Sequence, residues 1–382
     1  MIEFELTPEQ HLIKKTTREF SQKHILPGVI ERDEKSIFPK NEIKLMGELG
    51  YMGMMVPEIW NGSELDTISY VLAIEEIAAV ELATSTIMSV NNSLVCHVLN
   101  HYGSEEQKER YLKPLASGAK LGAYSLSETQ SGSDASNMKT LANKDGENYL
   151  ISGSKNWVTS GISSDIIIIF CVTGRKENKN EISAFIVEKG TEGFTVGKKE
   201  DKLGLRASDT CQIFFDNCKV SSKNMIGKPG EGFSIALNAL RGGRIGIAAQ
   251  ALGLARSALE RSIEYSKERI QFGKKISQFG SIKNKLAEMA TDIEAARMLV
   301  WKAAYLKDQN KNYLKESSMA KLFASKVAMK ASSECVQIHG GYGYIQEYGV
   351  ERLMRDAKIT EIYEGTSEIQ KLVIAREILK NN

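Results

Sequence analysis

The residue with the clearest chemical potential is Glu364, near the end of the chain in the stretch RDAKITEIYEGTSEIQ. Gly365 follows it and predicts a turn. A new helix is then expected, with Thr366 or Ser367 as its cap and Glu368 in its first turn, where an acidic side chain is favourable. A carboxylate on such a turn can project into a cavity and act as a general base, whereas a Glu beside a Gly is most often a solvated turn residue. The rest of the chain must therefore supply the cavity.

Composition and charge exclude several classes of protein. The 382 residues are 42% hydrophobic and 26% charged, as in an ordinary soluble protein, and suffice for two or three cores. The formal net charge of +2 gives no electrostatic footprint for nucleic acid, so no such partner is expected. The longest apolar run, residues 166–172, is far shorter than the roughly 18 residues that span a membrane, so no membrane association is expected.

Cysteine spacing and the first residues bear on compartment and metal chemistry. The five cysteines show no CxxC spacing, which predicts free buried thiols in a reducing compartment and no metal site. Only five histidines are present, so zinc or triad chemistry has few candidates. The N-terminus, MIEFE, has neither a signal nor a transit profile. We therefore expect the bacterial cytoplasm, or the mitochondrial matrix if the chain is a processed form.

The elements that position Glu364 change in type along the chain. Capping boxes at Thr7 and Ser104 and an apolar stretch over residues 68–80 predict a helical first part. After residue 122, short β-prone runs alternate with turn signals, as in a small barrel or sandwich. The expected strands are residues 149–153, 155–159, 165–172, 183–187, 194–196 and 212–215.

The helical period returns near residue 232. Apolar residues recur at three- or four-residue intervals from Ile245 to Ile263, in a stripe expected to end at Phe272-Gly273, and again from Ile282 to Ala303. Two further helices are expected, over residues 317–337 and 366–379. The fold class is thus α+β and multidomain: an N-terminal all-α domain (residues 1–121), a middle β-barrel or sandwich domain (122–230) and a C-terminal four-helix bundle (231–382).

Six segments, in this order, resemble the acyl-CoA dehydrogenase family, and most closely its short-chain, butyryl-type members. They are YSLSETQSGSD at 124–134, KNWVTSG at 155–161, GGRIGIAAQALG at 242–253, RIQFG at 269–273, QIHGG at 337–341 and IYEGTSEIQ at 362–370. The resemblance covers nearly the whole chain and implies the fold described above, with FAD as cofactor and an acyl-CoA as substrate.

The resemblance also implies where FAD binds. A flavin ring favours an aromatic neighbour and a hydroxyl near its reactive nitrogen, which Trp157 and Thr159, on one strand with alternating sides, can supply. The implied cofactor residues of the same chain are Tyr124, Leu126, Ser127, Gly132, Ser133, Trp157, Thr159, Thr366 and Glu368. Those that close over the FAD of a neighbouring subunit are Arg269, Gln271, Phe272, Gln337, Gly340 and Gly341. A homotetramer, built as a dimer of dimers, is therefore expected.

The implied reaction is dehydrogenation of an acyl thioester between Cα and Cβ. Glu364 matches the family's base and would remove the α-proton, while the β-hydride passes to flavin N5 and the electrons to an electron-transfer flavoprotein. Members of the isovaleryl and long-chain types carry the base instead at the position of Gly243, which here has no side chain. The implied substrate contacts are Ser133, Arg241, Arg244, Tyr363 and Gly365. The motifs favour a short straight acyl chain or a short 2-methyl-branched one.

Two other functions remain open on the sequence. Arg241 stands where the family usually has an Asp that contacts CoA, and this reversal of charge puts the CoA contacts in question. Thr129 replaces a common Pro, which should loosen a turn without removing a contact group. An acyl-CoA oxidase that uses dioxygen is one alternative, although such oxidases are usually much longer. A non-catalytic family member that acts as an assembly factor is the other, and the retained Glu364 argues against it.

Overall fold

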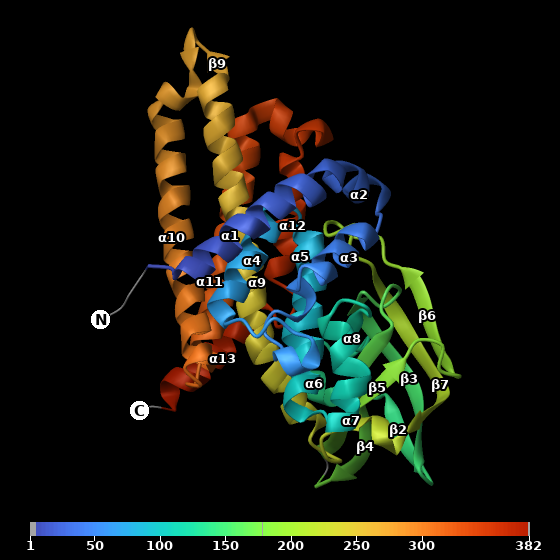
Figure 1. The fold of residues 1–382 in the computed structure, drawn as a ribbon. Helices are drawn as coiled ribbons and strands as arrows, with labels where there is room; N and C mark the ends of the chain where they lie inside the picture. The colour runs from blue at the N-terminus through green and yellow to red at the C-terminus, as the bar shows by residue number, and fades with distance from the viewer. Residues whose placement is uncertain (1–4, 178, 381–382) are drawn as a thin grey trace.

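The computed structural model describes residues 5–177 and 179–380, and they form a helical part, a β part and a second helical part (Figure 1). This α, β, α architecture confirms the fold class expected from the sequence. None of the described helices is long and apolar enough to cross a membrane. All five cysteines are buried free thiols, as expected.

The N-terminal part is a compact set of helices. They are α1 (Pro8–Phe20), α2 (Val29–Lys35), α3 (Lys40–Glu48), α4 (Thr67–Val80), α5 (Leu82–Ser89), α6 (His97–Tyr102), α7 (Glu105–Gln107) and α8 (Lys113–Ala116). Both predicted capping boxes are present: Thr7 caps α1 and Ser104 caps α7. A π-helical segment over Val90–Cys96 joins α5 to α6.

Helix α4 lies at the centre of the molecule and is buried on all sides. Its two acidic residues, Glu75 and Glu76, are therefore buried too, and both pair with Arg256 of the C-terminal part at 3.0 and 2.7 Å. Arg297 adds a second guanidinium to Glu75 at 2.8 Å. Because a buried carboxylate without a partner would be strongly destabilising, these ion pairs fix how the two helical parts meet.

The β part is one eight-stranded sheet with the order β6-β7-β3-β2-β4-β5-β8 and with β1 parallel to β4 at its side. The strands are β1 (Gly122–Ser125), β2 (Leu141–Asp145), β3 (Asn148–Thr159), β4 (Ile166–Lys176), β5 (Lys179–Glu188), β6 (Phe194–Lys199), β7 (Thr210–Ser221) and β8 (Met225–Ile226). The two strands expected over 149–153 and 155–159 are a single strand, β3. Its register against β7 shifts twice. These bulges interrupt the pattern of the strand without ending it, so the sequence suggested two strands where there is one.

The C-terminal part consists of α9 (Gly232–Glu268), α10 (Gly280–Asp308), α11 (Leu314–His339), α12 (Val350–Thr360) and α13 (Ser367–Leu379). Helix α9 runs through the middle of the molecule and packs against α4, α10 and α11 (Figure 1). It ends at Glu268, before the expected Phe272-Gly273, because a short hairpin follows, formed by β9 (Ile270–Gln271) and β10 (Lys274–Lys275). Helix α12 was not predicted, and it leads directly to the turn at Glu364.

Candidate active site

Glu364 lies on a turn between α12 and α13 whose backbone is left-handed at two successive residues. The φ angle is +51° at Glu364 and +99° at Gly365. A positive φ is rare for a residue with a side chain and persists where surrounding contacts hold it. Here Lys321 Nζ and Gln370 Nε2 both donate to the Gly365 carbonyl, at 2.7 and 2.8 Å, and Thr366 caps α13 as predicted.

The Glu364 carboxylate points at α9, into the space left by Gly243. A Cβ atom on Gly243 would collide with Glu364 Oε2 and would also press on Leu94. This Oε2 atom is buried and has no hydrogen-bond partner among the described residues. Burial raises the pKa of Glu364 to about 7, although the charges of Lys321 and Arg244 act in the opposite direction. The carboxylate is thus poised to take up a proton near neutral pH.

Arg244 lies near this carboxylate, and the charges of the two groups interact. It is buried, and its Nη1 donates to Ser318 Oγ on α11 at 3.1 Å. Burial lowers its pKa to about 10, and the neighbouring Glu364 partly offsets that effect. The guanidinium therefore stays charged at neutral pH and is fixed in orientation.

Three tyrosines surround Glu364. Burial raises the pKa of Tyr70, Tyr124 and Tyr363, and the charge of Glu364 adds to that shift in each case. Each hydroxyl donates a hydrogen bond: Tyr70 to Ser89 at 3.0 Å, Tyr124 to the Ala236 carbonyl at 3.3 Å, and Tyr363 to Gln250 at 2.7 Å. All three remain neutral at neutral pH, whereas the pKa of Glu364 lies near 7, so Glu364 is the acidic group of this cluster that exchanges a proton in that range. Tyr70, Ser89 and Gln250 were not singled out from the sequence.

The β part presents an exposed tryptophan at a bulge. Trp157 has φ +61° and keeps 64% of its side-chain surface exposed, while Thr159, two residues on, is half-buried. The register of β3 against β7 shifts between Lys155 and Val158, so Trp157 lies at the bulge itself. The buried Val158 separates it from Thr159. The Asn156 N–H donates to the Ser127 carbonyl at 2.8 Å, which ties this bulge to the segment containing Leu126 and Ser127.

The remaining predicted residues of this region are more open. Gly132 and Ser133 are exposed, and a Cβ on Gly132 would meet nothing within 4 Å. Glu368 is exposed in the first turn of α13. Arg241 stacks its guanidinium over Tyr313 at 5.9 Å, and its buried Nε has no partner among the described residues.

A second group of predicted residues lies elsewhere, at the hairpin end of α9 (Figure 1). Arg269, Gln271, Gly340 and Gly341 line a groove of about 590 Å³, in which Arg269 lies over the Tyr342 ring at 5.4 Å. Phe272 beside it is 93% exposed, and Gln337 is exposed nearby but does not line the groove. The rise of an α-helix puts Arg269 about 37 Å along α9 from Arg244. Within one chain, these residues are therefore separate from the Glu364 cluster.

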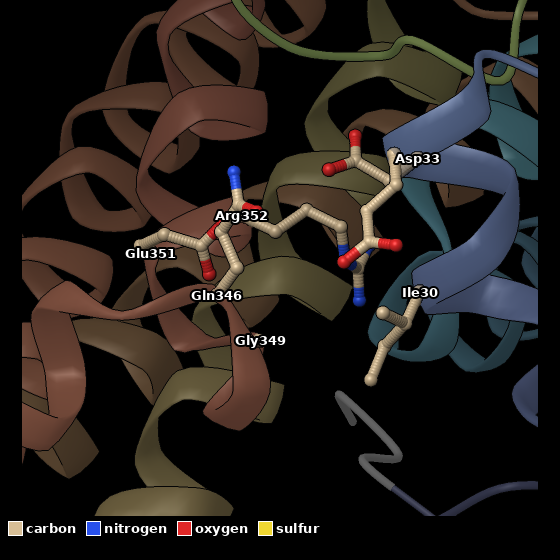
Figure 2. A pocket seen from close by; sticks show the side chains of 7 residues that line it. Ile30, Asp33, Gln346, Gly349, Glu351 and Arg352 are labelled. Carbon is tan, nitrogen blue, oxygen red and sulfur yellow. The ribbon is translucent and has the colours of Figure 1, made fainter.

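Helix α12 is anchored to the other two parts of the chain. Arg355 pairs with Asp33 of α2 at 2.5 Å and donates to the Leu203 carbonyl at 3.1 Å. Asp356 accepts from the Leu205 N–H at 2.6 Å. Figure 2 looks into the hollow between α2 and the start of α12, which measures about 10 Å³ and has room for about one water molecule at most, not for a substrate. This junction supports the Glu364 turn and is not itself a binding site.

The matches to known protein families agree with this architecture. Models of the acyl-CoA dehydrogenase N-terminal, middle and C-terminal domains match residues 7–119, 123–218 and 230–379. The chain therefore belongs to the acyl-CoA dehydrogenase family, whose members are FAD-dependent oxidoreductases.

Individual relatives match over nearly their whole length. An acyl-CoA dehydrogenase of Bacillus subtilis is 50% identical over 98% of this chain and 99% of the relative. A short-chain specific acyl-CoA dehydrogenase of Clostridium acetobutylicum is 47% identical over 99% and 100%. The butyryl-CoA dehydrogenase structure from Megasphaera elsdenii is 46% identical over 99% and 100%, with a TM-score of 0.97. A structure from work on the electron transferring flavoprotein of Acidaminococcus fermentans is 46% identical over the same shares, with a TM-score of 0.98.

The described residues fit the family's cofactor. A flavin combines a flat apolar ring with polar edges, and the exposed Trp157 offers an apolar face where a soluble sheet would normally have none. Ser125 Oγ and Asn156 Oδ1, in the two segments next to it, are buried and have no hydrogen-bond partner among the described residues. Buried polar atoms are normally paired, so a polar ligand edge at this position would satisfy them.

Proposed function

We propose that this protein dehydrogenates a short-chain acyl-CoA between the α and β carbons, with Glu364 as the base. The observation that carries the proposal is the buried, unpartnered Glu364 Oε2, which lies against Gly243 and has a pKa of about 7. The names of the relatives, a short-chain specific dehydrogenase and a butyryl-CoA dehydrogenase, support the substrate class.

Bound FAD would accept the β-hydride, which carries both electrons of this oxidation. Its ring side would be held by Leu126, Ser127, Trp157 and Thr159, with Tyr124, Gly132, Ser133, Thr366 and Glu368 nearby. The groove at the hairpin end of α9 would close over the FAD of a second copy, because it lies too far from the Glu364 cluster to reach the FAD of its own chain. The residues concerned are Arg269, Gln271, Gly340 and Gly341 in the groove, with Phe272 and Gln337 beside it. A homotetramer would supply this second copy.

The residues around Glu364 account for proton removal. Ionised Glu364 would take the α-proton, and Tyr70, Tyr124 and Tyr363 would limit the access of water to the carboxylate. Arg244 and Lys321 would stabilise the negative charge before the transfer. At pH 7 about half of the carboxylates are ionised, which suits a base that must accept a proton and later release it.

The geometry of α9 favours a short acyl chain. Gly243, Gly246 and Gln250 lie on one face of the helix and follow one another along it, starting at Gly243 beside Glu364. A Cβ on Gly246 would approach Ser89 Oγ at 2.6 Å and Tyr70 Oη at 2.8 Å, so these hydroxyls limit the space one turn beyond Glu364. The fully buried Gln250 comes next. A straight chain of a few carbons fits this description better than a long one.

The proposed electron acceptor is an electron-transfer flavoprotein. Support comes from the structure from Acidaminococcus fermentans, which arose in work on such a protein. Reduced enzyme should be reoxidised quickly by an electron-transfer flavoprotein and slowly by dioxygen. The reverse order would favour the oxidase alternative.

Anaerobic butyryl-CoA tests the proposal directly. The purified protein should carry FAD and be yellow, and butyryl-CoA should bleach the flavin band, whereas a long-chain acyl-CoA should bleach it much more slowly. A flavin that no short acyl-CoA reduces would contradict the proposed function.

A pair of adjacent glycines tests the geometry around the carboxylate. Gly243→Ala should displace the Glu364 side chain, and a misplacement of about 1 Å costs about 100-fold in rate. Gly242→Ala is the matched control, because its Cβ would meet only the Tyr313 hydroxyl at 3.9 Å. Stopped-flow flavin reduction should therefore slow in the first variant and not in the second. Equal rates in both would show that the space at Gly243 does not matter.

A further inference from the structure

Lys321 on α11 is a fully buried lysine to which the sequence assigned no role. Its side chain is completely inaccessible to solvent. Lysines are almost never fully buried without a partner. Within the described part of the chain, no carboxylate lies within ion-pair distance of Lys321, and its hydrogen bond goes to the Gly365 carbonyl at 2.7 Å.

That hydrogen bond is made to the left-handed turn on which Glu364 stands. The carbonyl also accepts from Gln370 Nε2 at 2.8 Å, so donors from α11 and α13 hold it from two directions. Without them, the positive φ at Glu364 would relax toward commoner backbone conformations and move the carboxylate away from Gly243. Arg244 makes a different hydrogen bond, from Nη1 to Ser318 Oγ.

The ammonium also acts on the carboxylate through its charge. The charged groups that face the two residues are Arg244 from α9, Glu361 at the end of α12 and Glu368 from α13, and the neutral Tyr70, Tyr124 and Tyr363 complete the surroundings. Burial lowers the pKa of Lys321 to about 8, while the charge of Glu364 raises it. Each of the two ions thus favours the charged form of the other.

We propose that Lys321 is the positioning residue of Glu364: it fixes the left-handed turn through the Gly365 carbonyl, and its charge favours the ionised form of the carboxylate. The inference rests on the proposed role of Glu364 as the base. It assigns Lys321 no contact with the substrate.

Three replacements separate the two effects. Lys321→Met removes both charge and donor, Lys321→Gln keeps an N–H donor without charge, and Lys321→Arg keeps the charge. The midpoint of the pH profile for flavin reduction should rise by about 1 pH unit or more in the Lys321→Met and Lys321→Gln variants. In the Lys321→Arg variant the midpoint should stay near that of wild type. Above about pH 8 Lys321 itself loses its proton and the charge effect disappears. The difference in rate that remains between wild type and Lys321→Met then measures the hydrogen bond to the Gly365 carbonyl, which neutral Lys321 still makes and which Lys321→Gln can make.

A direct titration makes the test independent of turnover. The infrared carboxyl band of Glu364, identified by its loss in Glu364→Gln, should titrate at higher pH in Lys321→Met and Lys321→Gln than in wild type. Lys307→Met, which removes another lysine with a pKa lowered to about 8, is the control and should leave the midpoint unchanged. If Lys321→Met does not fold, the titration midpoint of Lys321→Gln alone tests the effect of the lysine charge.

An unmoved midpoint in both uncharged variants, or an equal shift in Lys321→Arg, would overturn the inference. If butyryl-CoA fails to reduce even the wild-type flavin, the proposed function fails, and the infrared titration still decides the role of Lys321.

Discussion

Replacing Glu364 with Gln is expected to slow flavin reduction by butyryl-CoA by about 10²–10⁴-fold, the usual contribution of a general base. The amide has nearly the same shape but cannot accept the α-proton. The fold around this side chain does not depend on a charged carboxylate, because Oε2 is buried and has no hydrogen-bond partner among the described residues. The variant should therefore retain its FAD and its yellow colour.

Stopped-flow absorbance under anaerobic conditions measures this loss. Glu147→Gln makes the same chemical change at an exposed turn between β2 and β3 and should reduce its flavin at the wild-type rate. Reduction of Glu364→Gln at a rate close to wild type would show that another group removes the proton.

The same carboxylate sets the expected pH dependence. Burial raises the pKa of Glu364 to about 7, so the rate of flavin reduction should rise as pH increases through about 7. The effect on stability has the opposite sign. Because the folded-state pKa lies above the ordinary value of 4.5, the stability associated with the protonated form is present below about pH 4.5 and is lost as pH rises through about 7. Glu364→Gln should thus unfold at a higher temperature than wild type at alkaline pH. The wild-type protein is then less stable than the variant because it keeps the carboxylate that its function needs.

The sequence identified the Glu364 turn because its signals are local. Gly365 supplies the positive φ, and Thr366 supplies the cap of α13, and both are readable within three residues. Helix α12 also had a local signal, since Val350, Leu353 and Ala357 are buried at helical spacing, but we predicted no helix between residues 337 and 366 from the sequence. The single strand β3 was divided in two because bulges interrupt its pattern.

The residues that tune the base were not predictable in this way. Tyr70 and Ser89 come from α4 and α5, more than 270 positions before Glu364, and Lys321 comes from α11. A buried lysine on an amphipathic helix has the same sequence pattern as a solvated one, and only packing distinguishes them. The bulge at Trp157 is likewise a property of the β3–β7 pairing and not of the strand alone.

Replacing Lys155 is the substitution from which we expect the largest loss of stability. This residue is fully buried and pairs with Glu128 at 2.8 Å, and its Nζ also donates to the Leu126 carbonyl at 3.2 Å. Lys155→Met leaves a buried carboxylate without its cation, which should lower the free energy of unfolding by about 3–5 kcal/mol. Lys330→Met, which breaks exposed ion pairs, should cost about 0–1 kcal/mol and is the matched control.

The loss should depend on pH. Burial alone would raise the pKa of Glu128, but the Lys155 charge and the N–H groups of Lys139 and Thr140 outweigh it and bring the pKa down to about 2. A depressed carboxylate pKa contributes stability above the ordinary value of 4.5, and this contribution disappears as pH falls through about 2. The difference in free energy of unfolding between wild type and Lys155→Met, measured in urea, should therefore be largest at neutral pH and decrease as the pH falls.

The ion pair should also matter for the cofactor, because it joins the segment of Leu126 and Ser127 to the bulge of β3 that carries Trp157. Lys155→Met should release FAD more readily on dilution, as measured by the recovery of flavin fluorescence. Adding Glu128→Gln removes the uncompensated charge but keeps an acceptor for only one of the two N–H groups, because Lys139 and Thr140 donate to different oxygens of Glu128. The double variant should therefore recover part of the lost stability. A double variant no more stable than Lys155→Met would show that packing around the lysine stem, and not the buried charge, holds the two segments together.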